Sequence, residues 1–104
     1  MEMNTNNTMA IQAGKKMKID LFNQHKSNAH CLQVSLSTHI LNIQGMLNRG
    51  KDTLIIDYLL RVANQSSIEL PADFEILFSI EDKDARIDFL SHFILGLSLG
   101  RNSN

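Results

Sequence analysis

The sequence predicts a mainly α-helical fold, a small domain of three to four helices that includes an αα-hairpin and one short strand near the N-terminus. Apolar residues recur every three or four positions over residues 30–49 and again before Gly100, which is the period of an amphipathic helix. Wound at about 100° per residue, residues 54–63 are apolar over most of the circumference. We expect a helix of this kind to be buried on several sides.

The two ends of the chain are polar and bury little apolar surface. Asparagine and threonine alternate within residues 1–14, so this segment is expected to be a flexible leader. Residues 101–104 form a similar polar tail. These bounds leave residues 15–100 as a single helical domain.

Residues 16–22 alternate between apolar and polar side chains. Met17, Ile19 and Leu21 would point to one side, and Lys16, Lys18 and Asp20 to the other. A period of two predicts a half-buried strand. The alternative is an extended arm without a sheet partner.

The clearest predicted helix covers residues 30–49. Its apolar stripe consists of Leu32, Leu36, Ile40, Ile43, Met46 and Leu47. Ser27 or Asn28 would cap its start, and Gly50 would end it in the left-handed conformation. Val34, Leu41 and Gly45 form a second line on the far side, which predicts a seam for another helix; isolated apolar exposure is the alternative.

A second helix is expected from Asp52 or Thr53, as its cap, to about Asn64. Because the turn at Gly50 joins it to the preceding helix, the two form the predicted αα-hairpin.

Pro71 separates this part of the chain from residues 74–80, whose apolar pattern fits either a strand or a helix. Pro71 followed by Asp73 and Glu75 favours a short helix, since carboxylates suit a first turn. Asp82 or Asp84 would cap a last helix that ends near Leu99. Its buried face would contain Ile87, Leu90, Phe93, Ile94 and Leu97.

No motif predicts a catalytic, cofactor or metal site. His25, His30, Cys31 and His39 lie within fifteen residues of each other, but their spacing does not make ligands converge as a zinc site requires. Asp88 and His92 are expected to form an exposed i, i+4 pair. An enzyme would need a pocket around His39 or His92 that the sequence does not reveal, so the prediction is a non-enzymatic protein without cofactor or metal.

Composition points to the cytoplasm. The chain has 10 basic and 11 acidic residues, and its single cysteine excludes an intrachain disulfide. No apolar run precedes residue 19 and none approaches the ~20 residues that span a bilayer, so neither a signal peptide nor a membrane helix is expected. The basic cluster Lys15, Lys16 and Lys18 is interpreted as a solvated charge run.

The order strand, helix, glycine turn and helix resembles that of ribbon-helix-helix DNA-binding proteins over about 50 residues. In that family Met17–Leu21 would form the ribbon, and Gly50–Ile55 would open a helix whose N-terminus holds a phosphate. The resemblance implies nucleic-acid contacts at Lys16, Lys18 and Lys51. Two features depart from it: the first helix is too long by two turns or more, and Asp20 would face the DNA.

Residues 41–60 also resemble, in pattern only, small bacterial helical regulators of the biofilm and acid-stress connector type. That resemblance implies a dimeric all-α protein that acts through protein contacts. It assigns no site residue.

These features together predict a non-enzymatic regulator that binds and masks a larger protein, such as a transcription regulator, in the manner of an antirepressor or stress connector. A homodimer, a DNA-binding regulator and a secretion chaperone are the alternatives. The residues expected in the core or the interface are Leu54, Ile55, Leu59 and Val62, with Val34 and Leu41 in the second seam.

Overall fold

A computed structural model of the protein describes residues 5–24 and 29–99, and every regular element in these two ranges is helical. The elements are α1 (Thr5–Gln24), α2 (Ala29–Asn48), α3 (Asp52–Gln65), the 3₁₀ turn η2 (Ala72–Glu75), α4 (Ile76–Ser79) and α5 (Lys83–Leu99). The mainly α-helical class is confirmed. Within the described ranges there are five α-helices, more than the three to four that the sequence predicts.

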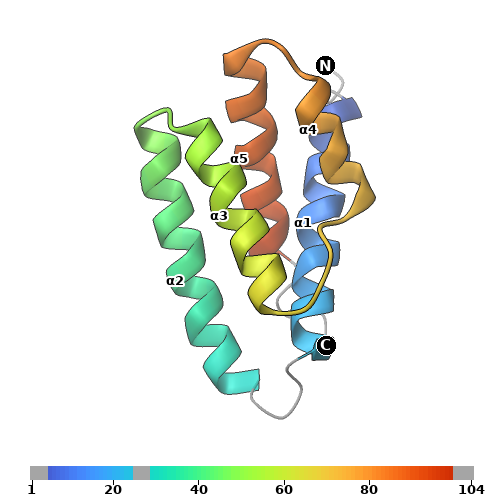
Figure 1. Ribbon diagram of the computed structural model, residues 1–104, viewed down its shortest axis with the longest axis vertical. Helices are drawn as coiled ribbons and strands as arrows, with labels where there is room; N and C mark the ends of the chain where they lie inside the picture. The colour runs from blue at the N-terminus through green and yellow to red at the C-terminus, as the bar shows by residue number, and fades with distance from the viewer. Residues whose placement is uncertain (1–4, 25–28, 100–104) are drawn as a thin grey trace.

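The helices pack side by side along the long axis of the molecule (Figure 1). The most extensive contact joins α1 to α5, and η2 packs against α1. α2 packs against both α3 and α5. α3 runs opposite to α2, to which the short turn at residues 49–51 connects it (Figure 1). α2 lies at one edge of the molecule in Figure 1, and it also makes a smaller contact with α1.

The core is one continuous cluster to which all these elements contribute. Phe74 of η2 is 1% exposed in this cluster, with its ring 5.1 Å from that of Phe93 and 6.2 Å from that of Phe89 between centroids. Edge-to-face rings at these distances attract each other beyond their burial alone. Phe74 therefore anchors the irregular segment between α3 and α5.

The strand predicted at residues 16–22 is wrong, because this segment is the C-terminal half of α1. Met17 is 1% exposed and Ile19 is 55% exposed, although alternation placed them on one face. The buried apolar side chains of α1 are Ala10, Ala13, Met17 and Leu21. Their steps of three and four residues are helical.

The flexible leader predicted for residues 1–14 is also wrong from Thr5 onward, because α1 begins there. Ala10 and Ala13 are fully buried and Gly14 lies against α5, so small residues give this half of α1 a close packing face. Small residues give a weak hydrophobic signal, which explains the error. Residues 1–4 and the predicted tail, residues 101–104, lie outside the described part.

The three other predicted helices are confirmed as α2, α3 and α5 within one or two residues. The predicted caps Ser27 and Asn28 and the predicted stop Gly100 lie outside the described residues, as does the side chain of Leu32. Residues 74–79 are helical, as the sequence favours, and Ile80 is extended. The amide of Ala85 donates to Asp82 Oδ2 at 3.0 Å, so Asp82 caps α5.

Two expectations for α3 are wrong. Leu54 and Leu60 are 51% and 47% exposed, so the helix is buried on one face and not on several. The helix begins at Asp52, and no side chain caps its first turn. Asp52 instead pairs with Arg86 of α5.

Candidate interaction surface

The outward side of α2 exposes apolar side chains that no described element covers. Val34 is 56% and Leu41 is 72% exposed, and a methyl group added to Gly45 would meet no atom within 4 Å. Thr38 is exposed between them. We call these four residues, Val34, Thr38, Leu41 and Gly45, the outer strip of α2.

Two exposed hydroxyl groups of α2 are bonded within the helix. Thr38 Oγ1 donates to the carbonyl of Val34 at 3.2 Å, and Ser37 Oγ donates to the carbonyl of Gln33 at 3.1 Å. These hydroxyls therefore need no external partner when the surface is covered, which lowers the cost of burying it.

No aspartate, glutamate, lysine or arginine occurs in the 20 residues of α2. The chain's 10 basic and 11 acidic residues all lie elsewhere. Depletion of charge is the compositional mark of the centre of a protein interface.

The inward side of α2 is already accounted for by the core of this chain. Leu36, Ile43 and Leu47 are buried there. α2 is therefore apolar on two opposite sides, and only the inner side has a partner among the described residues.

The six predicted interface residues divide between the surface and the core. Val34, Leu41 and Leu54 are exposed, whereas Ile55, Leu59 and Val62 are buried within the chain. The buried three belong to the face of α3 that packs on the rest of the domain, so they hold α3 in place and are not available to a partner.

A polar cluster joins α2 to α3 beside this surface. The Tyr58 hydroxyl lies 2.6 Å from His39 Nδ1 and accepts a hydrogen bond from Asn42 Nδ2 at 2.9 Å. Asn42 supplies a proton to this oxygen, and a neutral His39 can accept the Tyr58 hydroxyl proton at Nδ1. Burial lowers the pKa of His39, which favours this neutral form.

A small cavity of about 180 Å³ borders the cluster and is lined by His39, Tyr58, Arg61, Val62 and Gln65. His39 and Tyr58 are 19 residues apart in the sequence, so no local pattern predicts their contact. The cluster positions α3 against α2 and so supports the helix that bears the outer strip.

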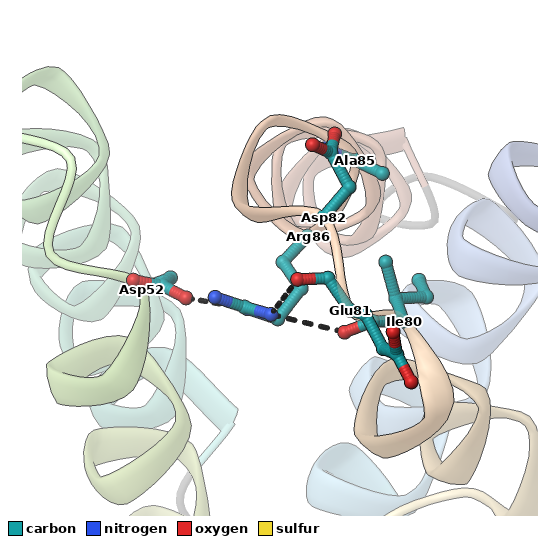
Figure 2. A network of polar contacts seen from close by, with 6 residues as sticks. All are labelled: Asp52, Ile80, Glu81, Asp82, Ala85 and Arg86. Atoms are coloured by element: carbon teal, nitrogen blue, oxygen red, sulfur yellow. Dashed lines mark hydrogen bonds and ion pairs between the residues drawn. The ribbon is translucent and has the colours of Figure 1, made fainter.

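A second polar network ties the start of α3 to the start of α5 (Figure 2). Arg86 Nε donates to Asp52 Oδ2 at 2.6 Å, and Arg86 Nη1 donates to the carbonyls of Ile80 and Glu81, both at 3.0 Å. The hydrogen bond from Arg86 lowers the pKa of Asp52 despite its burial. All these partners belong to the chain itself, so the network holds the start of α3 against the start of α5.

The three lysines of the DNA-binding alternative do not form one exposed basic face. Lys18 is 2% exposed, and its ammonium lies 5.7 Å from the centre of the Phe22 ring. Lys16 is exposed and pairs with Asp20 at 3.2 Å, while Lys51 is exposed before α3.

The predicted pair of Asp88 and His92 is present, with Oδ1 and Nδ1 3.6 Å apart. Asp88 also accepts a hydrogen bond from Asn7 Nδ2 at 2.8 Å, which joins α5 to the first turns of α1. Within residues 5–24 and 29–99 no three side chains of the metal-binding types are grouped to hold an ion. Of the four residues weighed as metal ligands, His25 and the side chains of His30 and Cys31 lie outside the described part, and His39 bonds to Tyr58.

None of the described helices combines the length and apolar character needed to cross a bilayer. Comparison with protein-family models, curated proteins and solved structures finds no match to this chain.

Proposed function

We propose that this chain is a non-enzymatic regulatory protein that binds another protein molecule through the outer strip of α2. The observation behind this proposal is the exposure of Val34 and Leu41 on a helix without charged residues, whose opposite face is already buried. Binding would place the helical domain over the partner's working surface and mask it. A transcription regulator is the kind of partner we favour, as for an antirepressor or stress connector.

The character of the strip supports a protein partner over nucleic acid. Nucleic acid is held through lysine and arginine side chains against phosphates, and α2 offers none. The DNA-binding alternative also depends on a ribbon at Met17–Leu21, where the chain is helical, and on Lys18, which is buried.

The polar clusters support a non-enzymatic role. The groups of His39, Tyr58 and Asn42 bond to one another, and Arg86 bonds to Asp52 and two carbonyls. Each cluster joins helices and directs its hydrogen bonds within the chain. These hydrogen bonds hold the helices in position relative to one another.

The test compares three tagged forms of the full chain as baits in extracts of the cells that express it: the unaltered protein, Leu41→Glu and Ile19→Glu. Ile19 is the matched control because it is 55% exposed on a different helix, α1. Glutamate is a good helix former, so neither change should unfold the chain.

We expect a defined protein to be retained by the unaltered chain and by Ile19→Glu and lost with Leu41→Glu. The identity of that protein separates a transcription regulator from a secreted client of a chaperone. Equal retention by all three baits, or nuclease-sensitive retention of nucleic acid alone, would contradict the proposal.

A further inference from the structure

We propose that a second copy of this chain covers the outer strip, with the two α2 helices packed antiparallel about a two-fold axis between Thr38 and Leu41. This inference rests on the proposed function, in which the strip binds protein, and it names a second copy as the occupant of the strip in the free protein, which a regulator would have to displace. Three properties of the strip point to a second copy: its spacing, its alternation of large and small residues, and its lack of charge.

The spacing of the strip is that of a helix–helix seam. Val34, Thr38, Leu41 and Gly45 follow one another at steps of four, three and four residues, which is the a/d pattern of packed helices. The order of these steps is the same when it is read in reverse. An antiparallel copy therefore presents the same spacing, as a two-fold symmetric interface requires.

In this register every layer joins a larger residue to a smaller one. Val34 meets the partner's Gly45, and Thr38 meets the partner's Leu41; the two-fold axis repeats both pairs. The open space at Gly45, where an added methyl would meet no atom within 4 Å, is the place that the partner's Val34 fills. Alternation of large and small residues lets facing layers interdigitate.

A parallel pair would be worse packed. Identical residues would meet, so two glycines would leave a void in one layer. The helix dipoles would also lie side by side in the same direction, whereas in an antiparallel pair they oppose each other favourably.

Charge complementarity also favours a copy of α2 as the occupant. A partner with charged side chains would bury them against a helix that has no charge to pair with them, which is unfavourable. A second α2 brings no such charge, and the two helices meet without like-charge repulsion.

The seam is short, so the dimer should be reversible. From Val34 to Gly45 the helix rises roughly 16 Å, about three turns. One helix face of this length buries less than the roughly 800 Å² per partner that is usual for stable interfaces. We expect monomer and dimer to exchange in the micromolar to millimolar range.

The first test is the mass of the purified full chain by sedimentation equilibrium over that concentration range, with circular dichroism as the check that each variant is folded. The unaltered chain and Ile19→Glu should pass from one chain to two as concentration rises, while Leu41→Glu should remain a single chain. A monomer at every concentration, or a dimer that Leu41→Glu leaves intact, overturns the inference.

The second test fixes the direction of the helices by disulfide formation in a Cys31→Ser background. A mixture of Thr38→Cys and Leu41→Cys chains should cross-link to the mixed dimer severalfold faster than either variant alone, because positions 38 and 41 face each other. Faster cross-linking of each variant with itself would show a parallel pair and overturn the inference.

These results remain distinguishable from a failure of the proposed function. If the chain is monomeric but Leu41→Glu releases a different protein from the bait, the strip has another occupant and the proposed function stands. If Leu41→Glu changes neither the mass nor the captured protein, both fail.

Discussion

Gly14 of α1 and Gly96 of α5 lie face to face where the two helices cross. A Cβ on Gly96 would lie 3.1 Å from the Cα of Gly14 and against the carbonyl oxygen of Ile11. A Cβ on Gly14 would lie 2.8 Å from the amide nitrogen of Leu97 and against the carbonyl oxygen of Phe93. Backbone atoms cannot move aside as a flexible side chain can, so the absence of side chains at both positions makes this crossing possible.

Gly14→Ala should therefore destabilise the protein by about 1–3 kcal/mol, the usual cost of inserting a methyl group into a packed contact. The free energy of unfolding is measured by urea titration at a concentration where the chain is monomeric. Gly45→Ala is the matched control, because its methyl meets no atom within 4 Å.

An alanine in an exposed helix interior is more stable than glycine by about 0.5–1 kcal/mol, so Gly45→Ala should raise the free energy of unfolding. If Gly14→Ala were as stable as the unaltered protein, the close crossing of α1 and α5 would be wrong.

Two adjacent leucines of α3 test which face of that helix is buried. Leu59 is 1% exposed and Leu60 is 47% exposed. Leu59→Ala should cost about 2–5 kcal/mol, since it leaves a cavity in the core. Leu60→Ala, measured in the same urea titration, should change the free energy of unfolding by less than about 1 kcal/mol. Similar effects for both variants would mean that the face of α3 assigned here as buried is the wrong one.

The pair of Asp52 and Arg86 should contribute to stability above the acid range. Arg86 holds the pKa of Asp52 below its ordinary value of 3.8, so the folded chain keeps this carboxylate charged where the unfolded chain protonates it. The contribution is complete above about pH 4 and is lost as pH falls from there through the pKa of the folded state.

Arg86→Met removes the charged hydrogen bonds and leaves Asp52 buried without its partner, which should cost about 1.5–3 kcal/mol at neutral pH. Residue 52 does not titrate in Asp52→Asn. The free energy of unfolding of this variant should therefore fall less in acid, by the contribution of this pair. The measurement is thermal or urea unfolding from neutral pH downward. An identical acid profile in Asp52→Asn would show that the pair does not act in this way.

His39 should make the protein less stable in mild acid. Because burial lowers its pKa in the folded chain, the unfolded chain takes up a proton more readily once pH falls below the ordinary imidazole value of 6.5. Stability is therefore unaffected by His39 above that pH and declines below it. The urea midpoint of the unaltered protein should fall more between about pH 7.5 and about pH 5.5 than that of His39→Gln. Equal falls in the two proteins would exclude His39 as the cause.

The sequence predicts the helices whose buried faces consist of large residues. α2 and α5 follow from the helical period of their leucines, isoleucines and phenylalanines, and Pro71 with the acidic residues after it identifies the short helical segment that contains α4. α1 is missed because much of its buried face is Ala10, Ala13 and Gly14, whose small side chains show no amphipathic stripe.

The outer strip of α2 is predictable in part, because its large apolar residues also follow the helical period. Val34 and Leu41 form a line opposite the stripe of α2, and both are exposed. The contacts of Tyr58 with His39 and of Arg86 with Asp52 join residues 19 and 34 positions apart. They depend on how helices pack, so no local pattern indicates them, and the sequence assigns Asp52 a capping role that the ion pair replaces.

The most direct test of the account is photo-cross-linking in the cells that express the protein, with a photoreactive amino acid at position 41 of α2 or, as the control, at position 19 of α1. We expect position 41 to yield a covalent adduct with a protein, either a second copy of this chain or a larger regulator, and position 19 to yield none. No protein adduct from position 41, or the same adducts from both positions, would contradict the claim that the outer strip of α2 is the working surface.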